Sequence, residues 1–168
     1  MSALIRLLGI DPGLQRCGWG VVLADGPRLA HVAHGVIKPR TDLSLAERLA
    51  HIVEGLEAVI AAHAPDEAAI EETFVNANAR AALALGQARG AAMVAPARAG
   101  LPVAEYAPTV IKKALVGSGG ADKTQIAFMV KRLLPTAGEM TADSADALAV
   151  ALCHAAHGRF HKRAGGAA

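Results

Sequence analysis

Cysteine is scarce in this sequence: Cys17 and Cys153 are the only two, they stand far apart, and they form no C-x-x-C pair. Disulfide scaffolds use several cysteines, and zinc sites use closely spaced ones. The sequence therefore predicts neither a disulfide-stapled fold nor a zinc centre.

Long hydrophobic runs are also missing. No apolar stretch approaches the ~20 residues that a membrane-spanning helix requires. The opening MSALIRLLGID is interrupted by Asp11 too early to serve as a secretory signal. We therefore expect a cytoplasmic protein that does not associate with a membrane.

The composition that remains is typical of a globular domain, with 53% hydrophobic and 19% charged residues among 168. A chain of this length suits a single core. The formal net charge is only +2, but from Gly100 onward 8 Lys or Arg stand against 5 Asp or Glu. We expect one domain over residues 1–157, followed by a basic, disordered tail at 158–168.

Hydrophobic periodicity predicts an α/β fold with a mixed five-stranded sheet flanked by helices. The first three strands, joined by short turns, form an antiparallel meander. A strand that is reached through a helix should run parallel to its neighbour. The predicted strands cover 4–10, 18–24, 28–37, 67–73 and 102–106. The predicted helices cover 45–63, 78–98, 108–115, 123–134 and 141–157.

Four acidic residues stand where such a sheet assembles sites. Asp11 ends the first strand, and Glu71 lies near the end of the fourth. Asp143 and Asp146 share one face of the last helix, and Val150 continues that face as an apolar surface. Each acid has an ordinary alternative as a turn former, a surface partner or a helix cap.

Together the four carboxylates favour a metal-dependent nuclease. Inward carboxylates repel one another unless a cation neutralises them, and their hard oxygens suit Mg²⁺ or Mn²⁺. Two such ions about 4 Å apart can activate water and stabilise the leaving oxygen of a phosphodiester. The basic second half of the chain suits a polyanionic substrate.

Aromatic residues are rare too, because the chain has only 3 Phe, 1 Tyr and 1 Trp. One of them, Phe74, stands three positions past Glu71, just before the polar segment VNANAR. Stacking on an unpaired base stabilises a complex by ~1–3 kcal/mol. Phe74 is therefore a candidate for DNA contact, with an aromatic clamp on its own loop as the alternative.

Six motifs, in this order and spacing, resemble the bacterial RuvC family of Holliday-junction resolvases: LGIDPG, AIEETF, LGQARG, EYAP, GSGGADKTQ and ADSADALA. The resemblance covers Leu8 to about His154. It implies a ribonuclease H-like fold and a homodimer that resolves four-way DNA junctions in recombination and repair. It further implies paired, Mg²⁺-dependent nicks in strands of like polarity, which leave 5′-phosphates and 3′-hydroxyls, and RuvA and RuvB branch-migration proteins as partners.

The resemblance also implies roles for individual residues. The catalytic and metal-binding carboxylates, with two ions per subunit, would be Asp11, Glu71, Asp143 and Asp146. Lys112 and Lys123 match basic residues near the active site, where an ammonium can steady a phosphate; each can equally be a solvated helix residue. Phe74 matches an aromatic that stacks on bases at the junction centre. The expected DNA contacts are Phe74, Asn78, Arg80, Lys112, Lys113 and Lys123.

Other functions fit less well. GSGGADKT departs from the phosphate-binding loop of ATPases because Asp122 replaces its last glycine. GIDPG is also similar to the phosphate hairpin of actin-like sugar kinases, but those need two such domains. An RNA-processing nuclease and a non-enzymatic DNA-binding module stay open as alternatives.

The alanine-rich helix and the histidines of the last helix also suggest roles. The alanine-rich helix around Gly86 and Gly90 is our candidate for the dimer interface, with packing on its own sheet as the alternative. His154, His157 and His161 share a helix face, and we expect them to belong to a tail near phosphate.

Overall fold

The protein is represented by a computed structural model that describes residues 3–72 and 77–164, with the backbone alone for 159–164. Its strands are β1 (Leu4–Asp11), β2 (Cys17–Asp25), β3 (Arg28–Ile37), β4 (Glu67–Glu71) and β5 (Val103–Tyr106). Its helices are α1 (Leu45–His63), α2 (Ala79–Arg98), α3 (Pro108–Val116), α4 (Lys123–Leu133) and α5 (Ala142–Ala164).

The five strands form one mixed sheet in the order β3-β2-β1-β4-β5. The β1–β2 and β2–β3 pairs are antiparallel, whereas β4 lies parallel to both β1 and β5. The meander and the parallel crossover predicted from the sequence are therefore confirmed.

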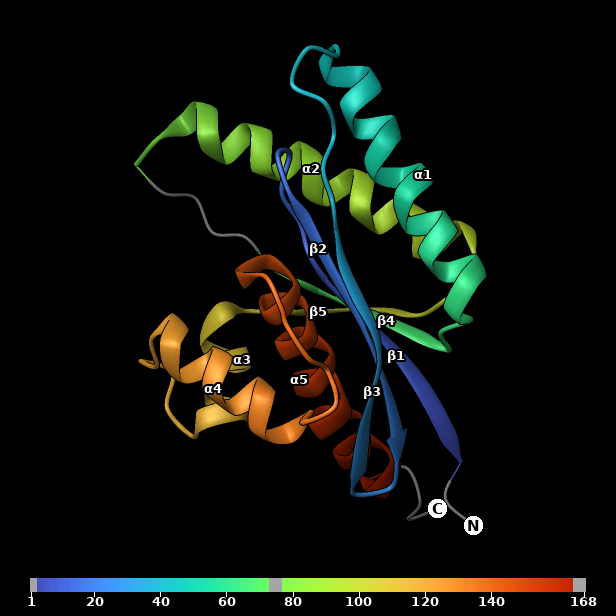
Figure 1. The fold of residues 1–168 in the computed structure, drawn as a ribbon, viewed down its shortest axis with the longest axis vertical. Coiled ribbons are helices and arrows are strands. Elements are labelled where there is room, and N and C mark those ends of the chain that lie inside the picture. The colour runs from blue at the N-terminus through green and yellow to red at the C-terminus, as the bar shows by residue number, and fades with distance from the viewer. Residues whose placement is uncertain (1–2, 73–76, 165–168) are drawn as a thin grey trace.

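Helices cover both faces of the sheet, with α1 and α2 to one side and α5, then α3 and α4, to the other (Figure 1). Successive side chains of a strand point to opposite faces of the sheet, so each strand contributes to two separate cores. Leu8 and Ile10 of β1 pack with α1 and α2, while Leu7 packs with α5. Apolar residues on every side of α5 are buried, as expected for a helix between a sheet and two further helices.

Two capping boxes begin helices on either side of the sheet. Ser44 and Glu47 form the first, before α1, by reciprocal bonds of 3.2 and 2.8 Å. Asp122 and Gln125 form the second, before α4, with both bonds at 2.9 Å. Asp122, the residue that departs from a phosphate-binding loop, thus has a structural role as a helix cap.

The last helix corrects one predicted boundary. α5 continues to Ala164, whereas the helix was predicted to end at 157. A glycine such as Gly158 costs a helix only about 1 kcal/mol, and the preceding turns of α5 are buried. The division into one domain and a basic, disordered tail stays a prediction.

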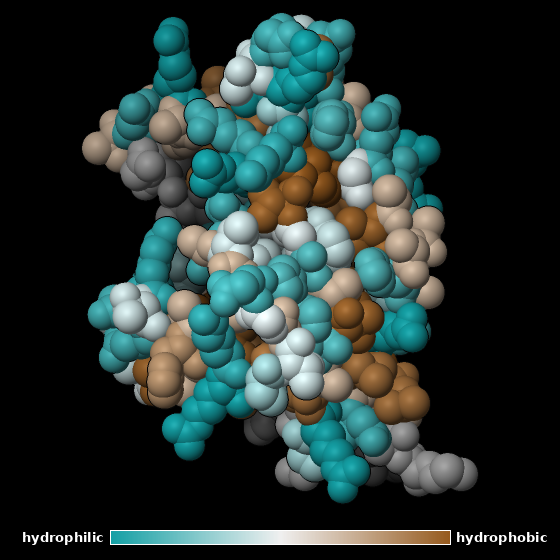
Figure 2. All heavy atoms as spheres, viewed as in Figure 1, coloured by the Kyte–Doolittle hydropathy of each residue, from teal (hydrophilic) through white to brown (hydrophobic). Residues whose placement is uncertain are grey.

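The surface shows no large continuous apolar area on the face in view. Hydrophilic side chains predominate there, and hydrophobic ones lie in separate patches (Figure 2). Within the described residues Cys17 and Cys153 are free and buried, as expected without a disulfide. None of the helices described combines the length and the hydropathy needed to cross a bilayer.

Candidate active site

The carboxyl ends of β1 and β4 bring two acids together. Ile10 pairs with Ile70 in the parallel ladder, so Asp11 and Glu71 come next on adjacent strands. An interaction between their side chains raises the pKa of Asp11 and lowers that of Glu71. Because an ionised carboxylate can only accept, a hydrogen bond between them requires a proton, and these directions favour Asp11 as the group that carries it.

α5 reaches the same edge because a glycine lets its backbone lie directly on the sheet. Gly18 of β2 pairs with Asp11, and a Cβ built on Gly18 would stand 2.1 Å from the carbonyl oxygen of Asp143. The start of α5 therefore lies over the end of β1. This position turns Asp143 and Asp146 toward the acids of the strands.

Burial and mutual repulsion raise the pKa values of Asp11, Glu71 and Asp146. Burial, followed by the charges of Glu71, Asp146 and Asp143, raises the pKa of Asp11 to about 8. Burial and then Asp146 raise the pKa of Glu71, and burial is also the main cause that raises the pKa of Asp146. Such shifts are typical of carboxylates assembled for chemistry rather than for stability.

Three cations offset part of this repulsion. Lys112 and Lys123 both lower the pKa of Glu71, and Lys123 does the same for Asp146. The guanidinium of Arg16 lies 3.9 Å from the carboxylate of Asp143. The two lysines expected near the site are therefore brought to it, and Arg16 joins them.

All four acids line one open pocket of about 680 Å³. Lys123, Arg16 and the Pro12–Gly13 turn complete much of its wall. A second pocket of about 400 Å³, between α3, α4 and α5, shares Glu71, Lys123 and Asp146 with the first and adds Lys112. The site thus has a polar acidic half and a more apolar half lined by helices.

The other expected DNA contacts lie elsewhere. Asn78 caps α2, where its side chain accepts from Ala81 N–H at 3.1 Å, and Arg80 is exposed in the first turn of that helix. Lys113 is exposed on α3. Among the described residues that line the two pockets, these three are not found. Phe74 lies outside the described residues.

The expectation for the histidines of α5 is wrong at two positions. His154 is buried, and its ring bonds to Tyr106 and Glu67. His157 donates from Nδ1 to the carbonyl of Cys153 in its own helix, at 2.9 Å. The shared helix face is turned toward the sheet at these positions instead of forming part of a tail. The side chain of His161 lies outside those described.

Two arginines of the site, Arg16 and Arg89, and the close glycine contacts were not among the predicted features. Arg89 of α2 donates to the backbone carbonyl of Glu71 at 3.2 Å and pairs with Glu105 of β5, which holds the end of β4 in place. Arg89 lies within the motif LGQARG, but its partner could not be read from the sequence. Glycines at alternate positions, Gly18 and Gly20, were the available signal for a close-packed helix.

The donor set suits a hard divalent cation. Its members offer only carboxylate oxygens, which Mg²⁺ and Mn²⁺ prefer, and a cation would relieve the mutual repulsion that raises the pKa of Asp11. Among the described residues, no group of three Asp, Glu, His or Cys side chains lies close enough together to ligate one ion in the present conformation. Holding an ion would require the carboxylates to converge further.

Comparison with known proteins gives a consistent result. A sequence model of the family Crossover junction endodeoxyribonuclease RuvC matches residues 7–154. The chain is 61% identical over 150 residues to the crossover junction endodeoxyribonuclease RuvC of Caulobacter vibrioides, covering 89% of each chain. It is 63% identical over 153 residues to the RuvC of Rhodopseudomonas palustris, covering 91% of this chain and 88% of that relative.

A solved structure agrees with these sequences. Thermus thermophilus RuvC in complex with a Holliday junction substrate is similar with a TM-score of 0.87 and 34% identity, over 94% of this chain and 96% of that one. This likeness confirms the ribonuclease H-like α/β fold predicted from the sequence. With the family model spanning most of the chain, and relatives above 60% identity, the chain belongs to the RuvC family of crossover junction endodeoxyribonucleases.

Proposed function

We propose that this protein resolves four-way DNA junctions by nicking them at the pocket lined by Asp11, Glu71, Asp143 and Asp146. Membership of the family makes the protein an endonuclease that resolves Holliday junctions. The observation that supports these residues as its catalytic groups is their convergence from β1, β4 and α5 on one pocket, where the pKa values of Asp11, Glu71 and Asp146 are raised.

The family depends on divalent metal ions, and here we propose two ions of Mg²⁺ or Mn²⁺ per subunit, held by the four carboxylates. When bound, such ions activate water and stabilise the leaving oxygen of the phosphodiester. The chain's own cations act beside them. Lys123 and Lys112 flank Glu71 and can hold the scissile phosphate and its developing charge, while Arg16 orients Asp143.

A direct assay separates the candidate activities. The protein is incubated with a four-way junction, a matched linear duplex and a structured RNA, each with Mg²⁺ and with EDTA. We expect Mg²⁺-dependent nicks in junction strands of like polarity, which DNA ligase can seal because the ends carry a 5′-phosphate and a 3′-hydroxyl.

Other outcomes of this assay would contradict the proposal. Preferred cleavage of RNA would favour the RNA-processing alternative. Junction binding without cleavage in Mg²⁺ or Mn²⁺ would favour a non-enzymatic binding module. An Asp146→Asn preparation, made in parallel, shows whether any cleavage comes from a contaminating nuclease.

We propose that the working form is a homodimer, because one carboxylate site cuts one strand and resolution takes two nicks. What supports α2 as the interface is its division into two faces. Ala88, Ala92 and Ala95 are buried against the domain. On another face Leu83 is 64% exposed and Val94 43% exposed, and the glycines between them leave open space for a close partner: Gly86 and Gly90.

A mixed dimer tests the paired-site mechanism. Wild-type and Asp11→Asn subunits carrying different tags are combined and purified as the mixed species. Acting on a supercoiled cruciform, that dimer should nick once and give an open circle, whereas the wild-type dimer gives a linear product. Efficient linearisation by the mixed dimer would show that one site can cut both strands.

Three finer points belong to the same proposal. Phe74 remains our candidate for stacking on bases at the junction centre. The exposed residues Asn78, Arg80 and Lys113 remain candidates for contacts with DNA outside the pocket. RuvA and RuvB are the proposed partners, and the cytoplasm is the proposed location.

A further inference from the structure

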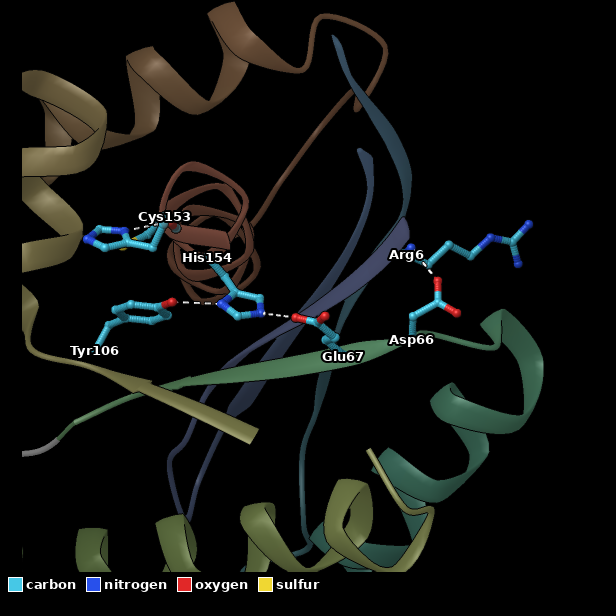
Figure 3. Close-up of polar contacts among 7 residues, drawn as sticks. Arg6, Asp66, Glu67, Tyr106, Cys153 and His154 are labelled. Atoms are coloured by element: carbon cyan, nitrogen blue, oxygen red, sulfur yellow. Dashed lines mark hydrogen bonds and ion pairs between the residues drawn. The ribbon is translucent and has the colours of Figure 1, made fainter. Parts of the chain in front are cut away.

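Away from the pocket, three polar side chains form a hydrogen-bonded chain on the α5 face of the sheet. The Tyr106 hydroxyl lies 2.7 Å from Nδ1 of His154, and Nε2 of His154 lies 2.7 Å from a carboxylate oxygen of Glu67 (Figure 3). Tyr106 ends β5, His154 belongs to α5, and Glu67 begins β4. The chain therefore connects three elements that the sequence keeps far apart.

Both ring nitrogens of His154 have a hydrogen-bond partner. The carboxylate of Glu67 can accept from Nε2, and the Tyr106 hydroxyl can donate to Nδ1. Burial, with the nearby Cys153 and Glu67, raises the pKa of Tyr106 to about 12, which keeps its hydroxyl a donor. His154 is only 8% exposed, so loss of a partner would leave a buried polar group unsatisfied.

The Glu67 end of this chain is anchored to the neighbouring strand. Asp66, the residue before Glu67, accepts from the backbone N–H of Arg6 at 2.7 Å and donates its own N–H to the Arg6 carbonyl at 2.8 Å. Figure 3 shows this contact beside the Glu67–His154 pair. His154 is therefore bonded to a strand end that is fixed relative to β1.

The spacing of the contacts relates this anchor to the active site. Glu67 and Glu71 lie four residues apart on one face of β4, which is ~13 Å along a strand. Asp146 and His154 lie eight residues apart on α5, which is ~12 Å along a helix. Glu71 is near Asp146, and Glu67 bonds to His154, so the helix runs antiparallel to β4 with matched spacing.

We propose that His154 and Tyr106 are positioning residues that hold α5 in the register at which Asp146 meets Glu71. This inference rests on the catalytic roles proposed above for the carboxylates. Apolar surfaces of Ala, Val and Leu on α5 can pack in neighbouring registers, whereas the two hydrogen bonds of the buried His154 ring are satisfied in only one. The contribution of the chain is therefore to geometry more than to net stability.

Two substitutions at one position test the proposal. His154→Leu removes both hydrogen bonds, whereas His154→Gln can donate an amide N–H to Glu67 and offer a carbonyl oxygen to Tyr106. Mn²⁺ affinity is measured by calorimetry without DNA, and cleavage rate is measured at saturating junction. We expect His154→Leu to lose ~10-fold in both, because a shift of α5 by a fraction of an ångström would misplace Asp146 relative to Glu71, and His154→Gln to stay close to wild type. Junction affinity in EDTA should be unchanged in both variants.

Val59→Ala is the matched control, because Val59 is buried in the core on the opposite face of the sheet. It should lower the melting temperature while leaving Mn²⁺ affinity at its wild-type value. Tyr106→Phe removes one hydroxyl and keeps the inference testable if His154→Leu fails to fold; it too should weaken Mn²⁺ binding.

Several results would overturn the inference. These are wild-type Mn²⁺ affinity in both His154→Leu and Tyr106→Phe, an equal loss in Val59→Ala, or no recovery in His154→Gln. If the variants give any of these results but the wild-type protein binds Mn²⁺ and cuts junctions, the proposed function still holds and only the positioning role is wrong. A wild-type protein that does neither would overturn the proposed function and this inference together.

Discussion

Asp11→Asn should abolish junction cleavage while leaving junction binding intact. Asparagine keeps the size of the side chain but lacks the charge that a hard divalent cation needs from this donor set. Changes in outer-shell partners of a metal site already cost about 10–100-fold, so we expect the rate at saturating junction to fall by more than ~10²-fold. Single-turnover cleavage and gel-shift binding on one junction measure the two quantities.

A surface carboxylate provides the control for this substitution. Asp42 is exposed and pairs only locally with Arg40, so Asp42→Asn should cleave junctions at the wild-type rate. If folded Asp11→Asn lost cleavage and binding together, Asp11 would be needed to hold DNA, and a purely catalytic role would be wrong.

The same substitution should stabilise the metal-free protein, and the gain should grow with pH. In the unfolded chain Asp11 titrates near 3.8, but in the folded protein its pKa is about 8. Between those values the folded state binds more protons than the unfolded state, so wild-type stability falls as pH rises. The amide does not titrate and escapes this loss.

Thermal melts in EDTA at about pH 5 and about pH 8 measure the effect. The melting temperature of Asp11→Asn should exceed that of wild type by more at the higher pH. Saturating Mg²⁺ should then raise the wild-type melting temperature more than that of the variant. A difference in melting temperature that stays constant with pH would contradict the assignment of the proton to Asp11.

Gly18→Ala should impair both stability and cleavage. A Cβ at this position would stand 2.1 Å from the Asp143 carbonyl oxygen and 2.6 Å from its carbonyl carbon, and both are backbone atoms that cannot rotate away. Overpacking of this kind typically costs ~1–3 kcal/mol of unfolding free energy. Relief requires the start of α5 to move, and misplacing catalytic groups by 1 Å can cost ~10²-fold in rate.

Gly120→Ala is the matched control. The nearest atom to a Cβ there is the Ser118 hydroxyl oxygen at 3.8 Å, an ordinary contact, so stability and cleavage should stay near wild type. Junction cleavage by Gly18→Ala is measured well below the melting temperature of the variant, so that a loss of activity reports displacement of α5 and not unfolding. Wild-type cleavage by a folded Gly18→Ala would mean that the helix position tolerates this contact.

Local patterns in the sequence were sufficient for most elements of the fold. Turn residues and alternating hydrophobic positions predicted the three antiparallel strands, and the Ser44 capping box marked the start of α1. Asp11 and Glu71 could be placed side by side because the carboxyl ends of parallel strands meet at one edge. These inferences succeeded since each depends on neighbours in the chain or on a general rule of sheet topology.

What the sequence determined by itself was therefore the sheet, its helices and the four acids that its edges present. Only the tertiary structure decided that α5 lies directly on Gly18, that burial raises the pKa of Asp11, and that Arg16 pairs with Asp143. It also placed His154, which was expected in a tail, at a buried position where it bonds to residues 48 and 87 positions away in the sequence. The physical reason is that periodicity records which face a residue occupies, whereas proton sharing, close backbone contact and polar pairing depend on which distant residue occupies the opposing position.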